Sequence, residues 1–338
     1  MVTIKDIAQA AGVSFSTVSK ALRDSPLVTP ETKRRIIAIA REMGYQPNIA
    51  ARRLVSKRSG AIGVVWPSIE RTALSTLITR VNDRLERRGV AMLLSLGGMD
   101  AAFATFRKFQ VDAILVFAGT EEGESRVPDS GGIPVLSYGA AGLARLPTVD
   151  VNRDLAIRLA VRHLASLGHR RIAYIGRPER PDPLQEVKAA AFRDETRALG
   201  LDSLDAPVAE LQGMEVHDGY AAARRLLAIA ANGDEAARRP TAVICGSCDL
   251  VRGVLRAAAE AGLNVPGGLS VAGYDNIPQM AELEVPVTAV GADIDEMAEL
   301  IADSLIRLVD RPDAVGTVTL EPSLVVRAST APPPADRD

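Results

Sequence analysis

The sequence predicts an α/β protein that begins with an all-α helix-turn-helix headpiece and continues as two lobes, each built on a doubly wound parallel sheet. Three observations predict this. Apolar residues recur at helical spacing on both sides of a glycine near the N-terminus. After about residue 60, short apolar runs alternate with helical stretches, which is typical of parallel sheets flanked by helices. Because this body of roughly 270 residues exceeds one typical domain, we expect two sheets.

The headpiece is predicted to begin with two short helices. In the first, Ile4, Ile7, Ala8 and Ala11 form one apolar face, with Thr3 as the N-terminal cap and Gly12 as the stop. The second runs from about Ser14 to Leu22 and turns Val18, Ala21 and Leu22 inward. Its outward residues are Ser14, Phe15, Ser16, Thr17, Ser19 and Lys20. A helix of this size, with small polar groups at its N-terminus, fits the major groove of DNA.

A third helix is predicted to open at Thr29-Pro30-Glu31, which supplies a capping hydroxyl, a proline at the first helical position and an acid in the first turn. It carries four basic residues, has an apolar face and ends at Gly44.

Short amphipathic helices with a glycine between them also occur in proteins that do not bind DNA, and charge favours the DNA-binding interpretation. Residues 1–60 contain eleven Lys and Arg against four Asp and Glu, a net charge of +7. The whole chain carries −2, so the remainder carries −9. A basic head on an acidic body is expected when one domain neutralises phosphates.

The N-terminal segment resembles the LacI/GalR family of transcription repressors. The residues that carry the resemblance are Thr3-Ile4-Lys5-Asp6-Ile7-Ala8, Ala11-Gly12-Val13-Ser14, Thr17-Val18-Ser19, Val28-Thr29-Pro30-Glu31-Thr32, Gly44-Tyr45-Gln46-Pro47-Asn48 and Ala50-Ala51-Arg52-Arg53-Leu54. The resemblance implies that Phe15, Ser16 and Lys20 read bases. It also implies that Ser14, Thr17, Thr29 and Asn48 touch the DNA backbone. Phe15 lacks the hydroxyl of the more usual tyrosine, so thymine contact and simple packing both stay open.

The same resemblance implies a hinge helix after the headpiece. Leu54 matches the leucine that the family wedges into the central minor groove, where it unstacks a base step. An ordinary linker leucine is the alternative. Ala51 matches a small residue that lets the hinge lie close to the groove, and Arg52 lies beside the wedge.

The body resembles the same family, whose core is of periplasmic-binding-protein type. The matching motifs are His163-Leu164, Leu167–Gly176, Arg239-Pro240-Thr241-Ala242, Val265–Ile277 and Leu324–Thr330. The predicted domains are the helix-turn-helix domain over 1–46, the hinge over 47–59, an effector-binding and dimerisation core over 60–330 and a disordered tail over 331–338. The first lobe is predicted over about 60–160 plus 288–315, and the second over about 161–287 plus 316–330.

The resemblance implies a ligand in the cleft between the lobes, beyond the carboxyl ends of the strands. Asp275, at the end of Gly273-Tyr274-Asp275, is the strongest candidate for a ligand contact. Trp66, the only tryptophan, either lines the cleft or packs in the core. Other candidate positions depart from the family. They are Lys188 in place of an arginine, Cys248 in place of an asparagine, Met214 in place of an aromatic residue, and Asn152 in place of an aspartate. Lysine cannot make the planar fork of arginine, so a plain sugar inducer is in doubt.

The sequence argues against other classes of protein. It has three histidines and neither a nucleophile elbow nor a phosphate loop, so no enzyme is predicted. Cys245 and Cys248 have the spacing of half a zinc site without a second pair, so neither a metal nor a cofactor is expected. Two cysteines fit a reducing compartment, and the absence of a signal-like or spanning apolar stretch predicts a cytoplasmic protein that has no membrane contact.

The leading hypothesis is a sequence-specific repressor that binds a near-palindromic operator as a homodimer, under the control of a small-molecule, sugar-like effector. The alternative is a ligand-blind regulator of the same fold, controlled by a protein partner or by its own abundance.

Overall fold

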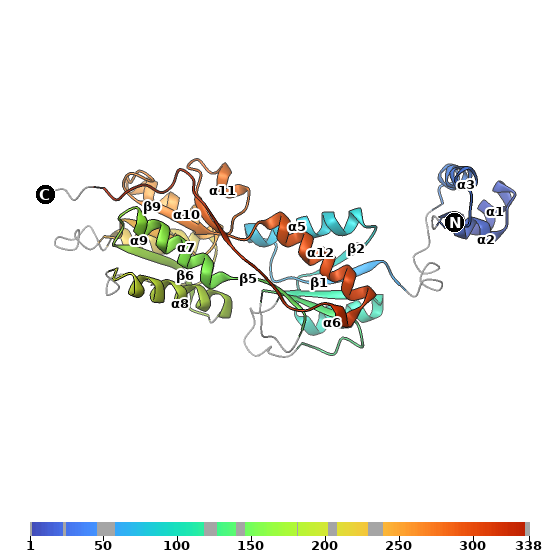
Figure 1. The fold of residues 1–338 in the computed structure, drawn as a ribbon, viewed down its shortest axis with the longest axis horizontal. Helices are drawn as coiled ribbons and strands as arrows, with labels where there is room; N and C mark the ends of the chain where they lie inside the picture. Colours follow the sequence, from blue (N-terminus) through green and yellow to red (C-terminus); the bar gives the residue numbers. More distant parts are fainter. Residues whose placement is uncertain are drawn as a thin grey trace. The chain divides into compact units, whose positions relative to one another are not determined.

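The computed structural model describes residues 2–22, 25–45, 58–117, 127–139, 146–180, 182–201, 208–228 and 239–334. The chain divides into two compact units, Met1–Ser59 and Gly60–Asp338 (Figure 1).

The first unit contains three helices: α1 (Ile4–Ala11), α2 (Phe15–Leu22) and α3 (Pro30–Glu42). Thr3 and Asp6 form a capping box at the start of α1, and Gly12 ends the helix with a left-handed φ of 63°. Ile7, Val18 and Ile36, one from each helix, are fully buried against one another. This small apolar core fixes the relative positions of the three helices.

The first lobe of the second unit is built on a six-stranded parallel sheet of order β11-β5-β4-β3-β1-β2. Its strands are β1 (Ala61–Val65), β2 (Ala91–Ser95), β3 (Ala113–Phe117), β4 (Val135–Tyr138), β5 (Thr148–Val151) and β11 (Val318–Leu320). Its helices are α5 (Thr72–Arg87), α6 (Met99–Phe109) and α12 (Ile294–Asp310), followed by the short 3-10 helix η4 (Pro312–Ala314).

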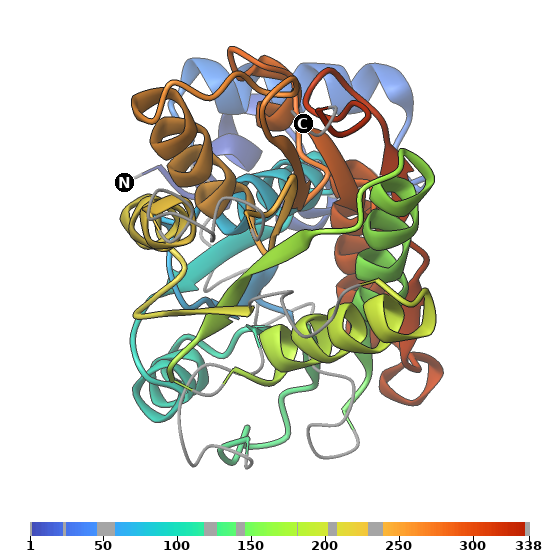
Figure 2. The same ribbon diagram turned by 90° about the vertical axis from the view of Figure 1, so that its left-hand side faces the viewer.

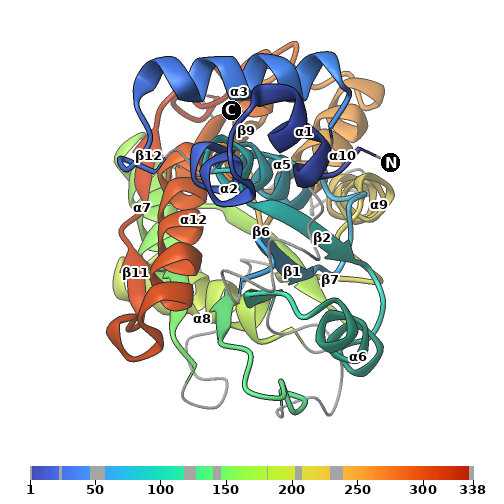
Figure 3. The same ribbon diagram turned by 90° about the vertical axis from the view of Figure 1, so that its right-hand side faces the viewer.

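Alternate side chains of this sheet face two different helical layers, as the two-residue period of a strand requires. Val65, Ile114 and Val116 pack with Phe103 and Phe106 of α6. The intervening strand residues pack instead with α5 and α12. Figure 3 shows α12 and α6 on opposite sides of the sheet.

The second lobe has the sheet order β12-β10-β9-β8-β6-β7, parallel except for the β10–β12 pair. Its strands are β6 (Ile172–Pro178), β7 (Val208–Leu211), β8 (Ala242–Cys245), β9 (Ser270–Tyr274), β10 (Thr288–Gly291) and β12 (Ser323–Val325). Its helices are α7 (Arg153–Ser166), α8 (Pro183–Ala198), α9 (Val216–Ala228), α10 (Cys248–Glu260) and α11 (Gln279–Glu282).

In this lobe α7 and α8 cover one face of the sheet, and α9 and α10 cover the other (Figure 2). The α9 and α10 helices approach closely because each offers a glycine. A Cβ atom on Gly253 would lie 2.2 Å from the Val216 carbonyl oxygen, and one on Gly219 would lie 2.5 Å from that of Leu250. A side chain at either position would push the helices apart.

The lobes divide the chain at points that differ from the predicted limits of 160/161, 287/288 and 315/316. All of α7 packs on α8, and β10 pairs with β9, so both belong to the second lobe. Strand β11 pairs with β5 in the first lobe. The chain therefore crosses between the lobes at residue 152, at 292–293 and at 321–322. Sequence periodicity marks where elements end, whereas lobe membership depends on long-range pairing, so the limits were wrong by several residues.

The prediction of a disordered tail over 331–338 is wrong at its start. The Ala331 amide donates to Ser270 Oγ at 3.1 Å, and the Ala331 carbonyl accepts from His169 Nε2 at 2.8 Å. His169 is 1% exposed, and burial lowers the pKa of its imidazole. The proline-rich composition of the tail predicts disorder. It gives no sign of these hydrogen bonds, because their partners lie far away in the sequence. Residues 335–338 lie outside the described residues.

Candidate DNA-binding face and interlobe cleft

The start of α2 presents the side chains that the sequence predicts for DNA contact. Ser14, Phe15 and Ser16 are exposed, with Phe15 at 53%, while Thr17 and Lys20 are partly exposed. Ser14 also caps the helix, because its Oγ accepts the Thr17 amide at 3.1 Å. The Ser14 hydroxyl thus takes one of the amides that the start of a helix otherwise leaves without a partner.

Two other side chains of the headpiece, those of Thr29 and Arg35, stabilise the ends of its helices. Thr29 is exposed and caps α3 by accepting the Thr32 amide at 3.4 Å. Arg35 donates from Nη2 to the Ala11 carbonyl at 3.1 Å. This arginine, which the sequence marks only as a positive charge, braces the end of α1. The other predicted contacts, Asn48, Ala51, Arg52 and Leu54, lie outside the described residues, as does the hinge helix.

A cavity of about 60 Å³ lies between the two lobes of the core, at the carboxyl ends of strands from both sheets. Tyr138 and Val151 close it from the first lobe, and Tyr274 and Gly291 from the second. This is the place where an open parallel sheet binds ligands. Its volume is far below the roughly 300–1,000 Å³ of typical ligand pockets, so the lobes are closed on one another in this structure.

Asp275 lines this cavity, as predicted for a ligand contact. Its backbone adopts a left-handed φ of 82°, which is uncommon for residues other than glycine, although Asp takes it more readily than most. Its Oδ2 accepts the Cys248 amide at 3.1 Å. Burial raises the pKa of the carboxyl group, and the positive charges of Lys188 and Arg71 oppose that rise.

Lys188 lies in the wall behind the cavity rather than on its surface. The side chain is 3% exposed, donates to the Gly246 carbonyl at 2.9 Å and stands 3.6 Å above the Tyr274 ring. Burial lowers the pKa of its amine to about 7. The contact with the ring favours the charged form, but desolvation outweighs it.

The other candidate effector residues take up structural positions among the described residues. Trp66 is 1% exposed and stacks on Tyr138 with ring centroids 5.9 Å apart. It therefore supports Tyr138, which lines the cavity, from behind. Asn152 caps α7 by accepting the Leu155 amide at 3.1 Å, and Met214 is buried. None of these three residues lines the cavity.

Arg71 and Tyr138 are among the lining residues that sequence reasoning missed. Arg71 immediately precedes α5, and its buried Nε has no hydrogen-bond partner among the described residues. Tyr138 ends β4, so the same rule that points to Asp275 could have pointed to it.

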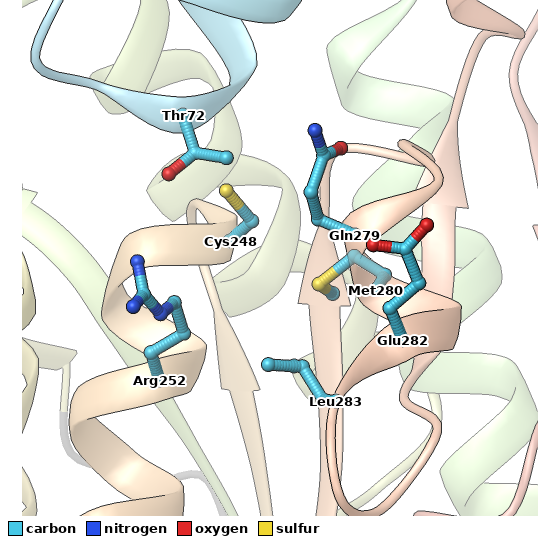
Figure 4. A pocket seen from close by; sticks show the side chains of 7 residues that line it. All are labelled: Thr72, Cys248, Arg252, Gln279, Met280, Glu282 and Leu283. Atoms are coloured by element: carbon cyan, nitrogen blue, oxygen red, sulfur yellow. The ribbon is translucent and has the colours of Figure 1, made fainter.

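A second pocket, of about 290 Å³, opens beside the cleft where α5 of the first lobe meets α10 and α11 of the second. Figure 4 shows Thr72 facing Cys248, with Gln279 and Met280 on the opposite wall. Cys248 thus faces this pocket, and burial raises the pKa of its thiol.

Direct hydrogen bonds join the lobes beside this pocket. Asp249 accepts the Thr72 amide at 3.0 Å and the Thr72 hydroxyl at 2.6 Å. One turn further along α5, the Thr76 hydroxyl accepts from Gln279 Nε2 at 3.2 Å. We refer to Thr72, Thr76, Asp249 and Gln279 as the interlobe contact.

Two absences apply to the described residues. No helix there is long and apolar enough to cross a membrane. No group of three or more His, Cys, Asp or Glu residues there could hold a metal ion.

An α-helical headpiece followed by two such lobes is the domain arrangement of a class of bacterial transcription regulators, and comparison with known proteins agrees. The family of bacterial regulatory proteins named lacI matches residues 3–48, and the periplasmic binding protein-like domain matches residues 161–330. The HTH-type transcriptional regulator reg1 of Streptomyces lividans is 30% identical over 350 residues, covering 99% of this chain and 98% of that protein. The lactose operon repressor of Escherichia coli K12 is 25% identical over 341 residues, covering 98% and 91%.

Solved structures show the same fold. The lac repressor dimer bound to operator and the anti-inducer ONPF matches with a TM-score of 0.80 at 24% identity, covering 98% of this chain and 99% of that one. The chain belongs to the lacI family of bacterial regulatory proteins and is a transcriptional regulator. The predicted family and fold class are confirmed.

Proposed function

We propose that this regulator is a repressor that binds a near-palindromic operator as a homodimer and responds to a small molecule in the interlobe cleft. The exposed start of α2 on a basic headpiece is the observation that carries the DNA-binding part. Two headpieces reading two half-sites require two paired cores. The operator-bound lac repressor of similar fold is itself a dimer, which supports this pairing.

The effector is proposed to be a polyhydroxylated, sugar-like molecule. The Asp275 carboxylate and the Asn276 amide offer hydrogen bonds to hydroxyl groups, and the rings of Tyr138 and Tyr274 offer flat apolar surface. Among proteins of similar fold, the regulator CelR forms a complex with cellobiose, and a regulator from Enterococcus faecium has bound ribose. We further propose that the protein works in the cytoplasm, without a catalytic step, a metal or a cofactor.

Selection of bound DNA from a random library by the full-length protein tests the DNA-binding proposal. We expect a two-fold-symmetric sequence that survives unlabelled scrambled competitor at moderate salt. Lys20→Ala should weaken binding by about 5- to 150-fold, the cost of about 1–3 kcal/mol expected for one base contact. Lys108→Ala removes the same charge from the exposed face of α6 in the core and serves as the control. Equal binding of selected and scrambled DNA would contradict the proposal.

A ligand-blind regulator is the second candidate, and the small cavity favours it. Thermal-shift screening of sugars, sugar phosphates, nucleosides and polyols separates the two candidates. A compound that raises the melting temperature and also changes operator affinity excludes the ligand-blind form.

A further inference from the structure

The interlobe contact includes a helix cap that comes from the opposite lobe. The N-cap residue of α5 is Arg71, whose side chain makes no capping hydrogen bond. The Asp249 carboxylate, on the first turn of α10, takes the Thr72 amide instead. A carboxylate at a helix N-terminus is favourable both for its hydrogen bond and for the helix dipole. The Thr72 amide at the start of α5 therefore has this cap only while Asp249 of the other lobe lies against it.

The cap is well shielded from water and has neighbouring support. The side chain of Asp249 is only 4% exposed, and both of its oxygens are used by Thr72. Cys248, which lies next to Asp249 in the chain, lines the same pocket as Thr72. Opening the lobes would expose all these groups at once.

A continuous chain of bonds connects the cap with the cavity. Asp275, which lines the cavity, holds the amide of Cys248, the first residue of α10. The next residue is Asp249, which holds Thr72 at the start of α5. Thr72 follows Arg71, which lines the cavity from the other lobe. The path thus leaves the cavity in the second lobe and returns to it in the first.

We propose that Asp249 and Thr72 are positioning residues that set lobe closure, and that Asp275 couples occupancy of the cavity to them through the start of α10. A ligand hydroxyl that donates to Asp275 adds a second hydrogen bond to the carboxylate that already accepts the Cys248 amide, and so shifts that carboxylate. Because this carboxylate holds the Cys248 amide, its displacement moves the first turn of α10. The hydrogen bonds between Asp249 and Thr72 are then weakened or strengthened. This deepens the proposed function, because it names the route by which a ligand changes the angle between the lobes.

Hydrogen exchange of the DNA-free, full-length protein, followed by mass spectrometry, tests the cap. Asp249→Asn leaves one acceptor where two are used, and Thr72→Val removes the hydroxyl but keeps the amide. We expect amides over residues 72–75 to exchange at least about tenfold faster in Asp249→Asn, as for the loss of a hydrogen bond to a charged acceptor. Thr72→Val should show a smaller increase.

Thr79→Val is the matched control. It makes the same change on the same helix, but the Thr79 hydroxyl donates only to the Ser75 carbonyl of its own helix, at 2.8 Å. Unchanged exchange in Asp249→Asn and Thr72→Val, or an equal increase in Thr79→Val, would overturn the cap. Trp66 fluorescence, which reports the core, checks that each variant is folded.

Asp275→Ala tests the coupling, since Asp275 makes no hydrogen bond to α5 among the described residues. We expect faster exchange over residues 72–75 in this variant, and less than additive acceleration when it is combined with Asp249→Asn. Strict additivity, or no effect of Asp275→Ala, would overturn the coupling while leaving the cap intact. No DNA enters these measurements, so failure to bind an operator would not alter their outcome.

Discussion

The buried amine of Lys188, behind the cavity wall, predicts how the free energy of unfolding of the core changes with pH. Its amine is buried, has one carbonyl acceptor and lies over the Tyr274 ring. Burial lowers its pKa from 10.5 to about 7, and the negative charge of Asp275 only partly opposes this. Between these two pH values the unfolded chain binds a proton that the folded protein releases. Stability should therefore rise with pH from about 7 to 10.5 and be independent of this group below about pH 6.

The size of the effect follows from the two pKa values. Raising the pH from 7 to 9 should stabilise the core by about 2 kcal/mol through Lys188 alone. Other groups titrate in the same range, among them the two buried cysteines, whose raised pKa values act in the opposite direction. Comparison with Lys188→Met removes their contribution, because the cysteines are present in both proteins.

Urea unfolding followed by Trp66 fluorescence measures the required difference. Trp66 is the only tryptophan and lies in the core, so unfolding of the headpiece does not contribute to the signal. Protein concentration must be held constant, because association adds to apparent stability. We expect the wild-type free energy of unfolding to rise relative to that of Lys188→Met between pH 7 and 9. Parallel pH profiles for the two proteins would refute the reasoning.

Three further predictions concern DNA binding and the ligand response. Leu54→Ala should weaken operator binding in a gel-shift or anisotropy titration while leaving nonspecific binding nearly intact, and equal losses on both DNAs would contradict a minor-groove wedge. Asp275→Ala should abolish the change in operator affinity caused by any compound that stabilises the wild type, and a normal response would remove Asp275 from the ligand site. Ile36→Ala empties a fully buried position in the headpiece and should destabilise it by about 2–5 kcal/mol. Its expected signature is loss of operator binding with an unchanged Trp66 unfolding transition, and retained affinity would argue against a cooperative headpiece core.

The headpiece was predictable in detail because its determinants are local. Thr3, Gly12 and Pro30 act within one helical turn of their own positions, and each has the predicted role in the structure. Arg35 is the exception, because its partner, the Ala11 carbonyl, lies 24 residues away in the sequence. The charge count included this arginine only as a positive charge, whereas the fold uses it to join two helices.

The cleft was only partly predictable, for the same physical reason. Asp275 and Tyr138 both follow from the rule that ligands lie beyond strand ends, although the sequence singled out only Asp275. Lys188 and Trp66 do lie near the cleft, but their burial behind Tyr274 and Tyr138 depends on how the layers pack. Asp249 was not a candidate at all. Its role needs the start of α5, 177 residues earlier in the chain, to lie against the start of α10.

The closed cleft imposes a condition on any effector. A cavity of about 60 Å³ is far smaller than the roughly 300–1,000 Å³ of typical small-molecule sites. The proposed sugar-like effector would therefore enter only after the lobes separate, and separation would break the hydrogen bonds between Thr72 and Asp249. An effector that lets these bonds reform around it would favour a lobe angle close to the present one. An effector too large for that would hold the bonds open and favour a different angle. Because a ligand shifts an equilibrium only through its differential affinity for the two states, ligand size relative to this contact should decide whether it strengthens or weakens DNA binding.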